Sequence, residues 1–169
     1  EGELKGIVDL LKMKAYTFAG DMGNQITEIE VPEEMKAEAE KFRAIFIERI
    51  VENDEEAMNA FLEGNEPDLD TLKRILRKAV IDRNVIPVFT GSSFKNTGVQ
   101  LVLDAVVDYL PSPIDIPPIG GTDPKTGEEI FRKASDEEPF SALAFKLQTD
   151  PYVGQLTYFR VYSGSVSAG

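Results

Sequence analysis

The segment between Pro111 and Pro139 most constrains how this chain can fold. Prolines stand at positions 111, 113, 117, 118, 124 and 139, and glycines at 120, 121 and 127. Because proline lacks a backbone N–H, it neither continues a helix nor pairs inside a sheet. The segment therefore predicts an ordered linker with a turn at 123–127. We expect folded elements on both sides of it, and 169 residues are enough for one ordinary domain or two small ones.

Short strands are predicted at the start of the chain. Ile7–Leu11 is a short apolar run that follows a glycine. Tyr16–Phe18 and Gln25–Val31 flank Gly20–Asn24, a cluster of turn-forming residues. These patterns predict one strand and then a hairpin with a loop of several residues.

Three helices are predicted to follow. Pro32 suits the first turn of a helix, Asn53 and Glu56 form a possible capping box for a second, and Asp70 suits the cap of a third. The side chains expected to face the core recur at steps of three and four: Met35, Ala39, Phe42, Phe46 and Ile50, then Met58, Phe61 and Leu62 ahead of Gly64, then Leu72, Ile75, Leu76, Ala79 and Val80. The exposed side of the third helix carries Lys73, Arg74, Arg77 and Lys78, which we expect to pair with neighbouring acids.

The stretch 85–110 predicts half of an α/β unit. Val85–Phe89 has the pattern of a strand covered on both faces, although Pro87 counts against a central position. The loop Gly91–Lys95 follows, and then a helix capped by Asn96 or Thr97. The helix is expected to face inward through Val99, Val102, Leu103, Val106 and Leu110. Backbone N–H groups in the loop could meet a ligand at the carboxyl end of the strand, and a tight turn explains the same residues equally well.

Two strands are predicted beyond the linker. Ala142–Leu147 and Leu156–Tyr162 are apolar runs joined by the turn-forming stretch Thr149–Gly154. Two strands alone are marginally stable in water. We therefore expect Gly169 to be the edge of a fragment.

The composition removes most catalytic chemistry. The chain has no cysteine and no histidine, so it lacks the commonest nucleophile–base pairs and the commonest metal ligands. The phosphate-binding pattern G-x-x-x-x-G-K-[ST] is absent, as are D-x-x-G, N-K-x-D and EF-hand spacing. We predict no catalytic residue and no metal site, and a carboxylate-based hydrolase has no spacing in its favour.

Charge and hydropathy bear on partners and location. The net charge is −12, and residues 31–70 hold 13 acidic and 4 basic residues, a net charge of −9. Such a surface repels phosphate backbones and favours a basic protein partner, unless it serves solubility alone. No apolar run reaches the roughly 20 residues that span a bilayer, and no signal peptide is evident. We expect a soluble cytoplasmic protein without a membrane partner.

Three groups of residues carry a resemblance to a known family. Gly91–Gln100, continuing through Leu103–Pro113, is similar to the end of the GTPase domain in the bacterial elongation factor G family, the translational GTPases. Gly6–Ala15 resembles the start of the insertion in that domain. Pro139–Lys146, Thr149–Gly154 and Phe159–Gly164 resemble the opening of the second domain, a β-barrel. The resemblance runs in order along essentially the whole chain.

The resemblance implies a fold that mixes α+β and α/β parts. Residues 1–84 would be the inserted α/β subdomain, and 85–113 the last strand, guanine loop and helix of the GTPase core. Residues 114–138 would be a linker, and 139–169 the first strands of a truncated, incomplete β-barrel.

The resemblance also implies a role in GTP-dependent ribosomal translocation of tRNA and mRNA. Backbone N–H groups of Ser92, Ser93 and Phe94 would face the guanine, although the family usually has alanine at the position of Ser93. GTP or GDP with magnesium would bind the parent protein, whose phosphate-binding motifs would lie upstream, so this fragment would not hydrolyse GTP or bind nucleotide tightly.

The partners that the resemblance implies are the ribosome and its mobile stalk protein, the latter through the acidic inserted subdomain. Glu34, Glu38 and Glu48 are the contacts we select on that subdomain. The barrel would meet ribosomal RNA. Self-association through open barrel strands is a further expectation.

Two other interpretations stay open. The parent could be a related GTPase, such as a tetracycline ribosomal protection protein or a release-type factor. The chain could instead be a free-standing, non-enzymatic acidic protein-interaction module, which predicts a compact monomer.

Overall fold

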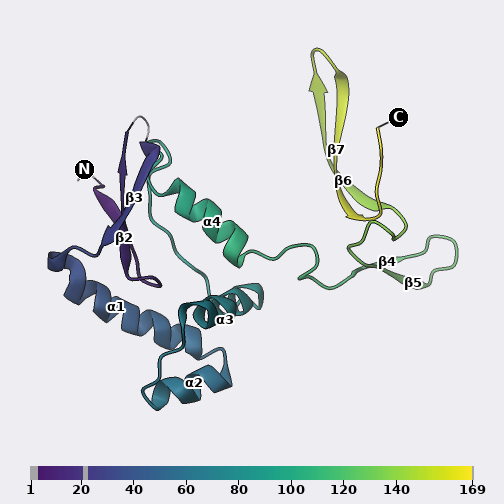
Figure 1. Ribbon diagram of the computed structural model, residues 1–169. Coiled ribbons are helices and arrows are strands. Elements are labelled where there is room, and N and C mark those ends of the chain that lie inside the picture. The colour runs from purple at the N-terminus through teal and green to yellow at the C-terminus, as the bar shows by residue number, and fades with distance from the viewer. Residues whose placement is uncertain (1–3, 21–22, 169) are drawn as a thin grey trace. The chain divides into compact units, whose positions relative to one another are not determined.

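The computed structural model describes residues 4–20 and 23–168. Over these residues the fold is mixed α and β, with four helices and three small antiparallel sheets (Figure 1). The chain divides into two compact units, Glu1–Leu110 and Pro111–Gly169. Within the described part of the chain, no helix has both the length and the apolar character needed to cross a membrane.

The first unit begins with a three-stranded antiparallel sheet. Strands β1 (Gly6–Asp9), β2 (Lys14–Ala19) and β3 (Gln25–Glu30) lie in the order β1-β2-β3, which confirms the predicted strand and hairpin. The first strand is shorter than predicted because Asp9 starts a turn. Its carboxylate accepts hydrogen bonds from the N–H groups of Leu11 and Lys12.

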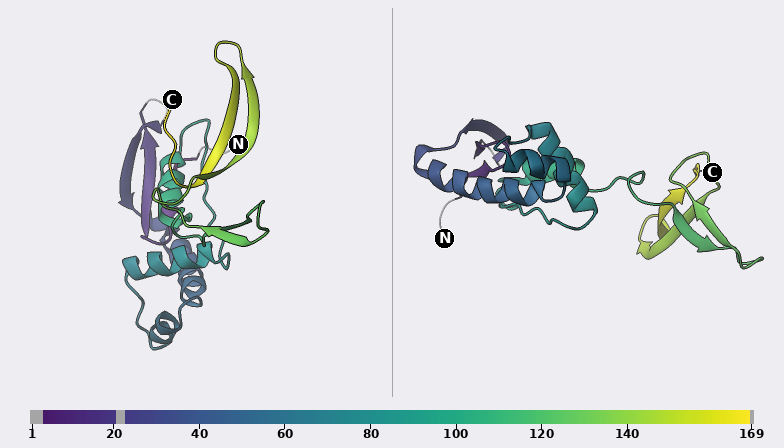
Figure 2. Two further views of the ribbon diagram at one scale, coloured as in Figure 1. Left: turned by 90° about the vertical axis from the view of Figure 1, so that its right-hand side faces the viewer. Right: turned by 90° about the horizontal axis from the view of Figure 1, so that it is seen from below.

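Helices α1 (Glu33–Val51), α2 (Glu55–Leu62) and α3 (Leu69–Ile81) follow the sheet. The core of the unit forms where α1 packs on α3, and Figure 2 shows these two helices together from two further sides. Its most deeply buried side chains are Ile47, Ile50, Val51, Leu72, Ile75 and Leu76.

The caps of these helices differ from the predicted ones by one or two residues. Asp54 caps α2 and Asp68 caps α3, in place of Asn53 and Asp70. Each aspartate accepts a hydrogen bond from the backbone N–H three residues later. The Thr71 N–H also lowers the pKa of the Asp68 carboxyl, because it stabilises the charged form. Gly64, with φ of +87°, follows the end of α2 as predicted.

The predicted core faces of α1 and α2 are partly wrong. Ala39 and Ile50 are buried, but Met35 and Phe42 are 44% and 48% exposed. The buried face of α1 is concentrated near its C-terminal end, where α3 meets it, and Met35 and Phe42 lie away from that contact and stay about half exposed. Leu62 is likewise 71% exposed. The predicted face of α3 is confirmed, since four of its five residues are buried and Val80 is half-buried.

The predicted strand at 85–89 does not form among the described residues. The segment is irregular, because Pro87 donates no hydrogen bond and no described strand lies beside it. Helix α4 (Val99–Tyr109) follows, and Gly98 rather than Asn96 or Thr97 caps it. Its inward face was also predicted incorrectly: Ala105 and Tyr109 are buried, whereas Val102, Leu103, Val106 and Leu110 are exposed.

The second unit is built from two hairpins. Strands β4 (Ile119–Thr122) and β5 (Glu129–Arg132) pair inside the segment predicted as a linker. The predicted turn between them is confirmed, since the Gly127 N–H donates to the Asp123 carbonyl over 2.8 Å. Strands β6 (Ser141–Asp150) and β7 (Gly154–Ser163) confirm the two predicted strands and extend them. In the described part of this unit the strands form no closed barrel.

Candidate functional site

The loop between the segment 85–90 and helix α4 is a small closed turn. The N–H of Ser92 donates to the Thr97 carbonyl over 2.8 Å, and the N–H of Thr97 donates back to the Ser92 carbonyl over 2.9 Å. The Asn96 N–H donates to the Ser93 carbonyl, with Asn96 at a φ of +52°. These backbone bonds fix the loop, and the Thr97 hydroxyl adds a long hydrogen bond of 3.5 Å to the Lys95 carbonyl. We call residues 92–97 the bridge loop.

The tip of the bridge loop offers backbone donors. No described residue accepts a hydrogen bond from the N–H groups of Ser93, Phe94 or Lys95. Ser93 is exposed and the Phe94 side chain is 90% exposed. Successive unpaired N–H groups in a turn are suited to a carbonyl oxygen or an anion. The structure thus brings the predicted residues Ser93 and Phe94 to one tip, while the Ser92 N–H is used to close the loop.

The sheet of the first unit supports the bridge loop from behind. Gly98 is buried at a φ of +79° and lies against Ile7 of β1. On the turn between β2 and β3, a Cβ atom on Gly23 would lie only 2.9 Å from the Lys95 carbonyl oxygen. The loop therefore rests on residues from two segments far away in the sequence. Sequence reasoning missed this support, and the only signal for it was the glycine at each contact.

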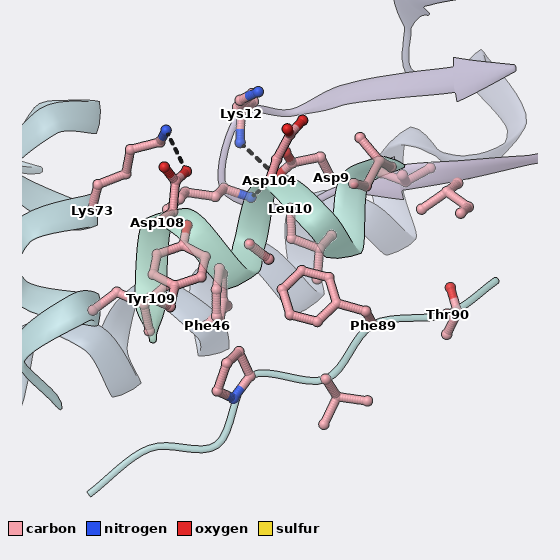
Figure 3. Close-up of a pocket in the computed structure, with 18 of the residues that line it drawn as sticks. Asp9, Leu10, Lys12, Phe46, Lys73, Phe89, Thr90, Asp104, Asp108 and Tyr109 are labelled. Atoms are coloured by element: carbon pink, nitrogen blue, oxygen red, sulfur yellow. Dashed lines mark hydrogen bonds and ion pairs between the residues drawn. The ribbon is translucent and has the colours of Figure 1, made fainter. Parts of the chain in front are cut away.

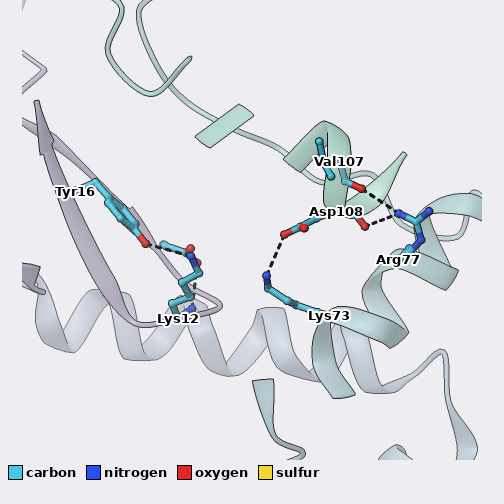
Figure 4. A network of polar contacts seen from close by, with 7 residues as sticks. Lys12, Tyr16, Lys73, Arg77, Val107 and Asp108 are labelled. Atoms are coloured by element: carbon cyan, nitrogen blue, oxygen red, sulfur yellow. Dashed lines mark hydrogen bonds and ion pairs between the residues drawn. The ribbon is translucent and has the colours of Figure 1, made fainter. Parts of the chain in front are cut away.

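The other end of α4 is held by α3. Lys73 Nζ lies 3.0 Å from Asp108 Oδ2, and Arg77 Nη1 donates to the carbonyls of Val107 and Asp108 over 3.2 and 2.8 Å (Figure 4). The last carbonyls of a helix lack partners within the helix, so a guanidinium there is favourable. We call Lys73 and Arg77 the α3 clamp. Arg74 lies 3.6 Å from Asp54, so the prediction that these bases pair with neighbouring acids is confirmed for Lys73 and Arg74.

A pocket of about 470 Å³ lies beside α4 within the first unit (Figure 3). The turn after β1, helices α1 and α3, the segment 85–90 and α4 all contribute to its wall, which is mainly apolar. Phe46, Phe89 and Tyr109 provide its largest side chains, and Lys73 and Asp108 also line it. Burial, with smaller contributions from Asp108 and Asp9, raises the pKa of Tyr109 to about 12. No short motif predicts the pocket, because five separate segments form it.

The predicted partner contacts lie on one side of α1. Glu34, Glu38 and Glu48 are all exposed, and none of them forms an ion pair with a described residue. Their spacing puts them on one helical stripe. Met35, Phe42 and Ile45, which are 44 to 48% exposed, flank that stripe. The structure therefore adds apolar side chains to the acidic surface. We call the surface formed by these three glutamates and three apolar residues the α1 face.

A bound metal ion needs several ligating side chains close together. Among residues 4–20 and 23–168, no three acidic side chains come together in a way that could hold an ion.

Comparisons with known proteins relate this chain to solved structures. No family model matches the chain. The chain is similar to the crystal structure of the protein ttk003000868 from Thermus thermophilus, with a TM-score of 0.71 and 30% sequence identity. The match covers 94% of this chain and 21% of that protein, so the chain spans about a fifth of its length. The similarity relates the sequence and fold of this chain to one stretch of a longer protein.

Proposed function

We propose that this chain is part of a translational GTPase of the elongation factor G type, which drives ribosomal translocation of tRNA and mRNA. Residues 1–84 are then the inserted subdomain, 85–113 the end of the GTPase core, 114–138 the linker and 139–169 the start of the barrel. One observation carries the proposal. Residues 85–90 pair with no described strand, and the bridge loop and helix α4 follow them. One side of α4 is apolar and exposed.

The uncovered apolar side chains favour a missing sheet. Ile86 and Val88 are each 85% exposed, and Leu103 and Val106 on α4 are 60% and 45% exposed. Helices that cross between parallel strands cover both faces of the sheet, so both strand and helix are apolar there. A parallel sheet beside residues 85–90 would bury these side chains. A GTPase core of the α/β class has such a sheet.

The bridge loop fits one edge of a nucleotide. The unpaired N–H groups at Ser93 and Phe94 suit the carbonyl oxygen of guanine, which would lie at the carboxyl end of the strand. The chain has none of the motifs that bind phosphates and magnesium. In this proposal those groups belong to other parts of the parent protein. The present chain contributes binding of the base and not hydrolysis.

The α1 face supports a partner on the ribosome. Exposed carboxylates beside exposed Met35, Phe42 and Ile45 suit a partner that offers basic and apolar side chains together. We assign this face to the ribosomal stalk protein, with Glu34, Glu38 and Glu48 as contacts. The barrel would meet ribosomal RNA, and the protein would act in the cytoplasm. Where strand edges of β6 and β7 stay open, the isolated chain would self-associate.

The first test is the coding DNA on either side of this chain. We expect G-x-x-x-x-G-K-[ST], D-x-x-G and N-K-x-D upstream, within roughly one domain's length. Downstream sequence would separate an elongation factor from a tetracycline protection protein or a release-type factor. A start codon directly before the first residue would contradict the proposal.

The second test measures nucleotide affinity in the complete gene product. Ser93→Pro removes the backbone N–H at the loop tip, so we expect the Kd for a fluorescent GDP analogue to rise at least about tenfold, the value of one hydrogen bond made in a dry site. Ser93→Ala keeps the N–H and should leave the Kd unchanged. Equal effects of both variants would contradict a backbone contact with guanine.

A second candidate function is a non-enzymatic interaction module, which the α1 face favours by itself. This alternative predicts that the complete gene product ends near this chain and binds no nucleotide. It would still bind a basic protein through Glu34, Glu38 and Glu48. The coding DNA and the GDP titration distinguish the two candidates.

A further inference from the structure

Helix α4 is attached at both ends to the elements before residue 82. At its start, Gly98 packs on Ile7 of β1, and the bridge loop packs on the turn at Gly23. At its end, the α3 clamp holds Asp108 and the last carbonyls. Between these points α4 is one helix of 11 residues, about 16 Å long.

We propose that Lys73 and Arg77 are positioning residues for the bridge loop and thereby set the rate at which guanine nucleotide leaves. The inference rests on the proposed function, because it assigns a regulator to the same nucleotide edge. The loop enters α4 directly through the buried pair Thr97 and Gly98. A short helix is rigid along its length. A shift of the C-terminal end of α4, which the α3 clamp holds, therefore changes the position of the loop at its N-terminal end.

The packing around α4 explains why the clamp matters. The side of α4 that bears Val102, Leu103 and Val106 is exposed, and the side that bears Ala105 and Tyr109 packs into the core with α3 and borders the pocket. Helix α4 is therefore held from one side, by this packing on α3 and by the contacts at its two ends. Of the described ion pairs, Lys73–Asp108 is the one that joins α4 to another element, and it spans 35 positions of sequence.

The same α3 helix carries the core contacts of α1. Leu72, Ile75 and Leu76 of α3 pack with Ile47 and Ile50 of α1. Any partner that docks on α1 therefore acts on the element that holds the end of α4. The arrangement gives the inserted part of the chain a mechanical connection to the nucleotide edge.

Hydrogen exchange in the present chain tests the connection. In Lys73→Met we expect the amides of Ser92 and Thr97 to exchange at least about fivefold faster, because the bridge loop opens more often. The matched control is Arg43→Met, which breaks the ion pair of Arg43 with Glu66 at 2.6 Å, away from α4. The control should leave the exchange of the loop amides unchanged. Equal acceleration in both variants, or none in Lys73→Met, would overturn the inference.

A charge exchange separates positioning from general loss of stability. The double variant Lys73→Asp with Asp108→Lys restores an ion pair between α3 and α4 in reversed order. We expect it to recover most of the slow exchange at Ser92 and Thr97, whereas Lys73→Asp alone does not. If the double variant instead accelerates exchange by the combined effect of the two single variants, the ion pair does not position the loop.

Nucleotide release in the complete gene product provides the functional readout. With a fluorescent GDP analogue, Lys73→Met should raise the dissociation rate about three- to tenfold, a shift typical of coupling between two sites. A complete protein that binds no nucleotide would overturn the proposed function and with it the assignment of a release rate. Ser93→Pro could weaken nucleotide binding while Lys73→Met leaves the dissociation rate unchanged. That result would overturn this inference alone and leave the proposed function standing.

Discussion

Gly98 lies so close to Ile7 that a Cβ atom at position 98 would collide with Ile7 Cδ1. The contact joins the start of α4 to strand β1, and Gly98 also has a φ of +79°. Alanine there would carry both a backbone penalty and a steric one. We expect Gly98→Ala to lower the free energy of unfolding by about 2 to 4 kcal/mol, measured by urea denaturation.

Gly64 provides the matched control for this substitution. It lies in the same unit at a φ of +87°, but a Cβ atom there would meet no atom within 4 Å. Gly64→Ala should therefore cost only the backbone term, about 1 kcal/mol. If the two variants lose the same free energy, Ile7 Cδ1 and the Thr90 carbonyl move away from the added methyl group at little cost.

Asp54 has two roles at the start of α2. Its Oδ1 accepts a hydrogen bond from the Ala57 N–H over 3.1 Å, and its Oδ2 lies 3.6 Å from Arg74. A lost cap costs more than a half-exposed ion pair. We expect Asp54→Ala to lower the free energy of unfolding by about 1 kcal/mol in thermal or urea denaturation.

Asp54→Asn isolates the cap from the charge. Asparagine keeps the acceptor for the Ala57 N–H and removes only the attraction to Arg74. The free energy of unfolding of Asp54→Asn should therefore remain within about 0.5 kcal/mol of that of the parent chain. A loss as large as that of the alanine variant would assign the stability to the ion pair instead.

Tyr109 makes stability depend on alkaline pH. Its pKa is raised to about 12 by burial, above the value near 10 of an exposed tyrosine. The folded chain therefore holds this proton more tightly than the unfolded chain does. The contribution of the protonated Tyr109 to the free energy of unfolding is complete below pH 10 and is lost as the pH rises from 10 to 12. At pH 11, midway between the two pKa values, we expect about 1 kcal/mol of that loss to disappear in Tyr109→Phe.

The measurement is urea denaturation of both chains at pH 8, 10 and 11. Comparing the two chains removes the titration of lysines and of the other tyrosines, which both share. Parallel stability curves would contradict a buried neutral Tyr109.

Local sequence patterns predicted most elements but not their surroundings. The hairpin β2–β3, the helix α3 and the strands β6 and β7 follow from periodicity and turn residues, which act over a few positions. The burial of Met35, Phe42 and Val106 was predicted incorrectly, because an apolar stripe shows that a side chain can be covered and not what covers it. The same limit applies to the strand at Val85–Phe89, since pairing needs a neighbouring strand.

The candidate site divides in the same way. Gly91 and the two serines after it indicated free backbone N–H groups in the loop 91–95, because that signal is local, while the resemblance named Ser92, Ser93 and Phe94. The support from Gly23 and the clamp between Lys73 and Asp108 were not predicted. These contacts join positions tens of residues apart, and single sequences carry no periodic signal for such pairs.

Ser163 is the polar anchor of the second unit. Its side chain is 2% exposed, donates to the Pro139 carbonyl over 2.7 Å and lies 2.9 Å from Ser141 Oγ. Removing the hydroxyl leaves the Pro139 carbonyl and the Ser141 hydroxyl without this partner. We expect Ser163→Ala to destabilise β6 and β7 by about 1 to 2 kcal/mol, followed by NMR signals of these strands in urea. Ser165→Ala, at an exposed position just beyond β7, should change nothing. If both variants keep the strands equally stable, the buried hydroxyl is not what fixes the end of β7 against the start of β6.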